Sequence, residues 1–148
     1  IGDIFSMRGI TRCRKGSDAQ LMEHLADEMK HAPDGSLIFA NFVEFDTLFG
    51  HRRDAEGYAG ALEWFDAQIG PILAESRSND LVIFTADHGN DPTWRGTDHT
   101  REQVPVLVHG QKLAQQLGCE RTIAFQDVAA TVAMHLGVVA QGQGRNFL

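Results

Sequence analysis

The sequence has few cysteines, no long hydrophobic run and a shortage of positive charge, and each shortage excludes a class of protein. Its two cysteines, Cys13 and Cys119, are too few for a disulfide framework or a cysteine-rich zinc module. No run approaches the ~18 apolar residues of a membrane span, and the first residues carry no signal-peptide pattern. A formal net charge of −7 argues against general nucleic-acid binding. We therefore expect a cytoplasmic protein whose partners are neither membranes nor nucleic acids.

What remains is a composition typical of one globular domain, with 148 residues of which 43% are hydrophobic and 22% charged. Apolar positions recur at helical spacing in three segments, which begin after Ser17, after Asp54 and at about Phe125. Continuous apolar runs predict strands at residues 37–43, 81–85 and 104–108. Strands that alternate with helices predict an α/β fold with a mainly parallel sheet flanked by helices.

Local signals predict where the helices begin and end. Ser17 has the spacing of a capping box, and Asp54 is placed to cap the second helix. Gly70-Pro71 is expected to kink or break that second helix. The last helix is expected to span residues 125–136 and to stop at Gly137.

Polar residues of the metal-binding types follow the first two predicted strands. They are Asp46 and His51 after the first strand, Asp87 and His88 after the second, and His99 eleven residues beyond His88. Open α/β sheets build their sites at the carboxyl ends of their strands. Oxygen and imidazole ligands without thiolate suit Mn²⁺, Mg²⁺, Fe²⁺ or Zn²⁺. The pattern predicts a divalent-metal site, provided that the chain turns at Gly89 and the loop to His99 doubles back.

Three contiguous motifs resemble those of phosphopentomutases, which are metalloenzymes of the alkaline phosphatase superfamily. FDTLFGHRRD begins at Phe45, TADHGNDPTWRGTDHTRE at Thr85 and VPVLVHG at Val104. The similarity covers nearly the whole chain and is to the C-terminal half of the enzyme. It implies a partial alkaline-phosphatase-like core that interconverts (deoxy)ribose 1-phosphate and (deoxy)ribose 5-phosphate through a phosphoenzyme. It also implies two divalent metal ions, with Mn²⁺ as the expected metal, and a sugar bisphosphate activator.

The resemblance implies a role for each of the five polar residues. Asp46, His51 and His99 match the ligands of one metal ion. Asp87 and His88 match ligands of the second, which also takes an aspartate from the N-terminal part of the enzyme. The family's nucleophilic threonine belongs to that same part, so we expect no catalytic nucleophile within this chain.

The chain is interpreted as a piece of a longer enzyme, because it begins at Ile1 and lacks these groups. Residues 1–16 match the return segment from an absent cap domain, and residues 17–148 match the C-terminal part of the metal-binding core. The expected partners are a small phosphorylated sugar and the missing N-terminal part. We expect the 148 residues alone to be inactive.

Further residues receive weaker assignments. Lys15, Arg52 and Arg53 are expected to contact the substrate phosphate, and ion pairs with neighbouring aspartates are an equal alternative for the two arginines. Four residues of the second motif are expected to orient the metal ligands: Asp91, Thr97, Asp98 and Arg101.

Two other functions remain open on sequence alone. A cofactor-independent phosphoglycerate mutase or a phosphatase of the same superfamily would use a similar site. The glycerate mutases, however, carry Gly-His-Thr-Gly where this chain has Gly50-His51-Arg52-Arg53. The alternative from a different class is a non-catalytic metal-binding domain.

Overall fold

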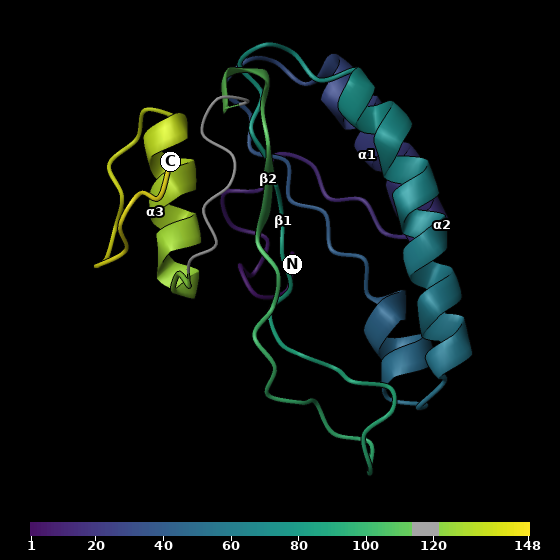
Figure 1. Cartoon of the computed structure of the whole chain (residues 1–148). Coiled ribbons are helices and arrows are strands. Elements are labelled where there is room, and N and C mark those ends of the chain that lie inside the picture. Colours follow the sequence, from purple (N-terminus) through teal and green to yellow (C-terminus); the bar gives the residue numbers. More distant parts are fainter. Residues whose placement is uncertain (114–121) are drawn as a thin grey trace.

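The computed structural model describes residues 1–113 and 122–148, so Cys119 lies outside the described residues. In chain order, the elements are α1 (Asp18–His31), the π-helix η1 (Phe45–Gly50), α2 (Ala55–Ala74), β1 (Val82–Phe84), β2 (Leu107–His109), the 3-10 helix η2 (Gln111–Leu113) and α3 (Phe125–His135). Helices α1 and α2 lie side by side on one side of the two strands, and α3 lies on the other (Figure 1). Among the described residues, none of the helices combines the length and the hydropathy needed to cross a membrane.

Helix α1 begins where the sequence predicts, because Ser17 forms a capping box with Gln20. The Ser17 hydroxyl accepts the Gln20 backbone N–H at 3.3 Å, and the Gln20 side-chain oxygen accepts the Ser17 N–H at 3.0 Å. The next residue, Asp18, is buried and accepts the backbone N–H groups of Val43 at 3.1 Å and Glu44 at 3.2 Å. Burial raises the pKa of Asp18. The first turn of α1 is therefore tied to the segment that enters η1.

Helix α2 is capped by Asp54, as predicted, through a 2.9 Å hydrogen bond from the Gly57 N–H. The predicted break at Gly70-Pro71 is wrong, because the helix continues through Pro71 to Ala74. Pro71 lies in the last turn, and Ile69 and Ile72 on either side of it are buried. The packing of these two side chains keeps the last turn helical although Pro71 has no N–H to donate.

The apolar core lies between α1 and α2. Its buried members are Met22, Ile69 and Ile72, and the partly buried side chains around them are Leu25, Met29, Phe42, Trp64, Phe65, Leu73 and Phe84. Phe65 meets Phe42 edge-on at a centroid distance of 5.2 Å and Phe84 at 6.2 Å. These ring contacts connect the helices to β1 and to the segment before η1.

The sheet differs from the predicted one. The two strands pair antiparallel, with Val82 opposite His109 and Phe84 opposite Leu107, so the described residues form no parallel pair. Residues 37–43 form no strand, because no described backbone group offers them ladder hydrogen bonds. The run predicted at residues 104–108 becomes β2 only from Leu107 onward. The predictions of a strand at 37–43 and of a β2 that starts at 104 are therefore corrected.

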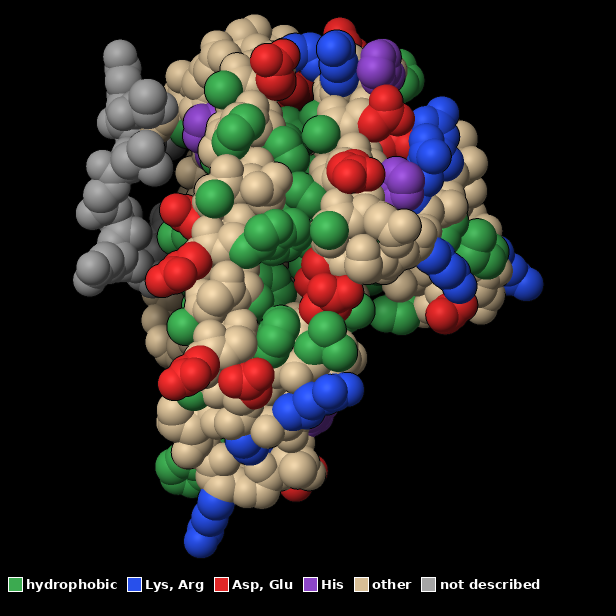
Figure 2. Space-filling model, turned by 90° about the vertical axis from the view of Figure 1, so that its right-hand side faces the viewer, with side chains coloured by type: hydrophobic (Ala, Val, Ile, Leu, Met, Phe, Trp, Pro, Cys, Tyr) green, Lys and Arg blue, Asp and Glu red, His purple; other side chains and the backbone are tan. Residues whose placement is uncertain are grey.

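The molecule exposes more surface than its size requires. Its accessible surface is 10837 Å², whereas a compact monomer of this mass would expose about 7,500 Å². Exposed apolar side chains include Leu37 and Phe39, which are 63% and 64% exposed. Figure 2 shows the outer face of the α1–α2 layer, where hydrophobic side chains form a band between charged ones. Much of the apolar surface of this chain is therefore exposed to solvent.

Helix α3 ends as the sequence predicts, with Gly137 in the left-handed conformation at a φ of 68°. The residues after it fold back along the helix (Figure 1). Asp127 accepts the Arg145 N–H at 2.8 Å, and the buried Thr131 hydroxyl accepts the Phe147 N–H at 3.1 Å. Polar contacts thus attach the last residues to α3.

Candidate metal centre

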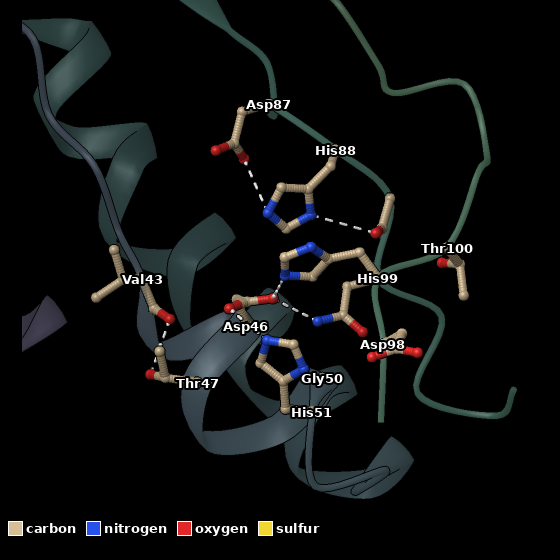
Figure 3. A network of polar contacts seen from close by, with 12 residues as sticks. Val43, Asp46, Thr47, Gly50, His51, Asp87, His88, Asp98, His99 and Thr100 are labelled. Atoms are coloured by element: carbon tan, nitrogen blue, oxygen red, sulfur yellow. Dashed lines mark hydrogen bonds and ion pairs between the residues drawn. The ribbon is translucent and has the colours of Figure 1, made fainter. Parts of the chain in front are cut away.

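The turn formed by residues 45–53, here called the η1 turn, positions Asp46. The π-helix is closed by the His51 N–H, which donates to the Asp46 carbonyl at 2.9 Å. Such wide turns occur frequently at functional sites. Because Asp18 holds the backbone just before the turn, the Asp46 carboxylate is directed towards the loop between the strands (Figure 3).

The β1–β2 loop, residues 85–106, doubles back on itself as predicted from the sequence. Gly89 and Thr100 form an isolated antiparallel bridge, with the Thr100 N–H donating to the Gly89 carbonyl at 2.9 Å. The Thr100 hydroxyl also accepts the Asp91 N–H at 2.7 Å. This closure stacks the ring of His99 on the ring of His88, with a centroid distance of 3.7 Å.

The Asp46 carboxylate lies at the centre of the cluster. One oxygen is 3.2 Å from Nε2 of His51, and the other is 3.4 Å from Nε2 of His99. Asp46, His88 and His99 each offer a ligand atom, and these atoms all lie within 4.8 Å of one another. Figure 3 shows the Asp46 carboxylate between the imidazoles of His51 and His99, with the ring of His88 stacked on the other side of His99.

The chemistry of this cluster fits a divalent cation. Nδ1 of His51 lies within hydrogen-bond distance of the Thr97 carbonyl, and only a protonated Nδ1 can donate to it. In the neutral ring, Nε2 then points a lone pair at the Asp46 carboxylate. Two such acceptors repel unless a proton or a metal ion lies between them. The hydrogen bond to the carbonyl also selects the tautomer that a metal-binding histidine uses.

Asp87 lies apart from the other four predicted ligands. Its side chain is 85% exposed, and its carboxylate meets Nε2 of His88 at 3.5 Å. In Figure 3, it lies on the opposite side of His88 from Asp46. The structure therefore brings Asp46, His51, His88 and His99 together and leaves Asp87 at the edge of the cluster, facing solvent.

The three residues expected at the substrate phosphate differ in environment. Lys15 and Arg52 are exposed and take no part in the hydrogen bonds or ion pairs of the described residues. Arg53 is half-buried, has a φ of 57° and donates to five acceptors of the protein. Lys15 and Arg52 thus remain free to meet a ligand, whereas the Arg53 guanidinium is already engaged.

The residues expected to orient ligands act through different groups. The Asp91 carboxylate accepts from the Thr93 N–H and hydroxyl, and these bonds lower the pKa of Asp91. Thr97 orients His51 through its carbonyl, and Asp98 accepts from Arg53 through its carbonyl. Arg101 is exposed and lines an open cleft of about 490 Å³ together with Trp94, His99, Thr100 and Glu102.

Sequence reasoning missed Asn90. Its amide nitrogen donates to the Asp46 carboxylate, and its amide oxygen accepts from Arg53 at 2.9 Å. A Cβ atom at Gly50 would collide with this amide, so a glycine is needed there for the close approach of the two segments. The signal that could have identified Asn90 is its position between two ligand-type residues, His88 and Asp91, in the DHGND motif.

The pKa of Tyr58, on α2, is affected by the negative charge of the cluster. Its ring meets Phe45 at a centroid distance of 5.8 Å. Burial, and then the negative charge of Asp46, raise the pKa of Tyr58. The phenol therefore stays protonated beside the carboxylate.

Comparisons with known proteins identify the superfamily and the relatives of this chain. The chain belongs to the Metalloenzyme superfamily, which matches residues 3–140. It is 49% identical over 151 residues to the phosphopentomutase of Rhizobium leguminosarum bv. trifolii, and 52% identical over 150 residues to that of Methylobacterium radiotolerans. The phosphopentomutase of Chromohalobacter salexigens is 48% identical over 153 residues. Each alignment covers 100% of this chain and 36% of the relative, so the chain spans about a third of their length.

Proposed function

We propose that this chain is the C-terminal, metal-binding part of a phosphopentomutase that interconverts (deoxy)ribose 1-phosphate and (deoxy)ribose 5-phosphate. The single observation that carries the proposal is the convergence of Asp46 with His88 and His99 in a chain related to phosphopentomutases along its full length. A carboxylate and imidazoles without thiolates suit Mn²⁺, which is the metal we propose.

The proposed ligands divide as the family resemblance implies. Asp46, His51 and His99 hold one ion, and Asp87 and His88 contribute to the second. When bound, the two ions supply charge that stabilises the oxygens of a phosphoryl group in transfer. The His51 Nδ1–H to the Thr97 carbonyl keeps this imidazole in its binding orientation. Asn90 holds one oxygen of Asp46 and fixes the direction of the other.

The remaining parts of the reaction are proposed to lie outside these residues. Two threonine hydroxyls near the cluster are hydrogen-bonded to the backbone, since Thr47 donates to the Val43 carbonyl at 3.0 Å and Thr100 accepts from the Asp91 N–H at 2.7 Å. We propose that the nucleophilic threonine and a further aspartate come from an N-terminal part, with residues 1–16 leading from a cap domain into residues 17–148. Strands of that part would extend the sheet to the parallel sheet of the superfamily and cover exposed side chains such as Leu37 and Phe39.

The substrate phosphate is proposed to lie near basic side chains that the protein leaves free. Lys15 and Arg52 are exposed and unpaired among the described residues, which fits this role. Arg101, which lines the cleft together with His99, is a further exposed basic group. These basic side chains could form charge-assisted hydrogen bonds with the phosphate of a phosphorylated sugar.

The test is the conversion of ribose 1-phosphate to ribose 5-phosphate, in the presence of Mn²⁺, by the full-length product of the gene that encodes this chain. We expect turnover by that product, loss of turnover in Asp46→Asn, and no turnover by the 148 residues alone. Turnover by the 148 residues would place the nucleophile among them. Activity on phosphoglycerate instead of pentose phosphate would favour the phosphoglycerate mutases, and metal binding without either activity would favour a binding domain.

A further inference from the structure

We propose that Arg53 is a positioning residue of the metal centre, which joins the η1 turn to the β1–β2 loop and thereby sets the affinity for the metal. The proposal rests on the metal centre proposed above. In this role, Arg53 donates hydrogen bonds to carbonyl groups of the protein and does not bind the substrate phosphate.

The guanidinium of Arg53 connects two segments that are distant in sequence. Within the η1 turn, it donates to the Gly50 carbonyl at 3.2 Å. Across to the loop, it donates to the carbonyls of Asp91 at 2.7 Å, of Gly96 and of Asp98, and to the Asn90 amide oxygen at 2.9 Å. A single side chain therefore fixes four successive points of the loop against the turn.

Three of these points, Asn90, Gly96 and Asp98, act on or adjoin a residue of the proposed metal centre. Asp98 directly precedes His99, and Gly96 directly precedes Thr97, whose carbonyl orients His51. Asn90, held by Arg53 on one side, donates to the Asp46 carboxylate on the other. If the guanidinium is removed, three carbonyls of the loop lose their common donor and the loop is free to move away from Asp46.

Only a planar group with several donors can perform this function. The acceptors surround the guanidinium, and its Nε, Nη1 and Nη2 atoms all donate. A lysine ammonium would supply the charge but could not reach the same acceptors from one point. Arg53 also adopts a φ of 57°, a conformation that disfavours side chains, so the hydrogen bonds of the guanidinium hold the residue in a backbone geometry that glycine adopts more readily.

The experiment measures the Mn²⁺ dissociation constant of the full-length gene product by EPR of free Mn²⁺, independently of activity. The main variant is Arg53→Gly, because glycine tolerates the positive φ and the variant therefore tests the side chain alone. We expect a 10- to 100-fold weaker affinity, the range typical of residues that orient metal ligands. Arg53→Lys should lose most of the same affinity, and added guanidinium ion should restore part of it in Arg53→Gly.

The matched control is Arg77→Ala. Arg77 also joins distant backbone segments, since it donates to the carbonyls of Met29 at 3.3 Å and Ala32 at 3.0 Å, but it lies at the end of α1, away from the cluster. This control should lower the melting temperature and leave the Mn²⁺ affinity and the response to guanidinium unchanged.

Two results would overturn the proposal in different ways. Wild-type affinity in Arg53→Gly, or an equal loss in Arg53→Gly and Arg77→Ala, would show that Arg53 contributes stability only. Absence of Mn²⁺ binding by the wild-type protein would instead remove the metal centre itself, and the inference about Arg53 with it.

Discussion

The α1–α2 layer and the pair of segments around the metal centre are held together by different forces. The layer depends on apolar contacts of side chains such as Met22, Ile69 and Ile72. The η1 turn and the β1–β2 loop depend on hydrogen bonds, many of them from Arg53 and Asn90 to groups more than 35 residues away. Polar contacts of this kind need no buried apolar surface. The cluster is therefore well defined in a chain that leaves much of its apolar surface uncovered.

This comparison predicts that changes in one region leave the other largely intact. Variants in the cluster should change metal binding more than stability. Variants in the α1–α2 layer should change stability and leave the metal affinity of the folded molecules unchanged. The following changes test this separation, in order of decreasing expected effect.

The largest effect on metal binding is expected from Asp46→Ala. This carboxylate is the group that His51, His99 and Asn90 all face, and its loss removes a ligand together with the negative charge of the cluster. We expect the Mn²⁺ affinity, measured by titration calorimetry, to fall by more than about 100-fold, beyond the range of residues that only orient ligands. The control is Asp34→Ala, which removes a carboxylate that is 96% exposed. An unchanged affinity in Asp46→Ala would contradict the assignment.

The largest effect on stability is expected from Ile72→Ala. Ile72 is 8% exposed in the core between the helices, and truncation of such a side chain costs about 2–5 kcal/mol of unfolding free energy. Urea unfolding followed by circular dichroism measures this change. Leu62→Ala on the same helix is the matched control, since Leu62 is 51% exposed and should change the stability by less than about 1 kcal/mol. A large loss of Mn²⁺ affinity in folded Ile72→Ala would contradict the claim that the two regions are independent.

The local signals of the sequence predicted the helices and their caps, because a capping box or a left-handed glycine acts within a few residues. Ser17, Asp54 and Gly137 all act where they were expected. The closure of the β1–β2 loop was also predictable, since Gly89 lies next to the ligand residues.

Long-range pairing was not predictable in the same way. An apolar run such as residues 37–43 is compatible with a strand, but it becomes one only if a neighbouring strand offers hydrogen bonds. The antiparallel pairing of β1 with β2 depends on the path of the loop between them. The contacts of Arg53 and Asn90 depend on how two loops approach each other, and nothing in the local sequence specifies that distance.

A smaller effect on stability is expected from Ser17→Ala. The change removes the hydroxyl that accepts the Gln20 N–H and leaves the first turn of α1 without this partner. Loss of such a cap costs about 1 kcal/mol. The unfolding free energy in urea measures it, and Ser17→Asp, which keeps a capping oxygen, should be close to wild type. Equal destabilisation by both changes would show that the capping box contributes nothing.

The smallest effect is expected from Asp127→Asn and depends on pH. Hydrogen bonds from the Arg145 and Ala124 N–H groups lower the pKa of Asp127 below its unfolded value of 3.8. Asp127 therefore binds a proton less readily in the folded protein than in the unfolded chain. Its ionised form contributes stability above pH 3.8, and this contribution is lost as the pH falls through the folded pKa. Wild type should be slightly more stable than Asp127→Asn at neutral pH. This difference should shrink below pH 3.8, and a difference that grows on acidification would contradict the assignment.

The central claim is that imidazoles of the η1 turn and of the β1–β2 loop bind one divalent ion beside Asp46. Electron spin-echo envelope modulation of Mn²⁺ bound to the full-length gene product tests it directly, because imidazole nitrogens that bind the ion modulate the echo. We predict nitrogen modulation in the wild-type protein that weakens in His99→Gln and in His51→Gln. Bound Mn²⁺ without nitrogen modulation, or modulation unaffected by either change, would contradict the account.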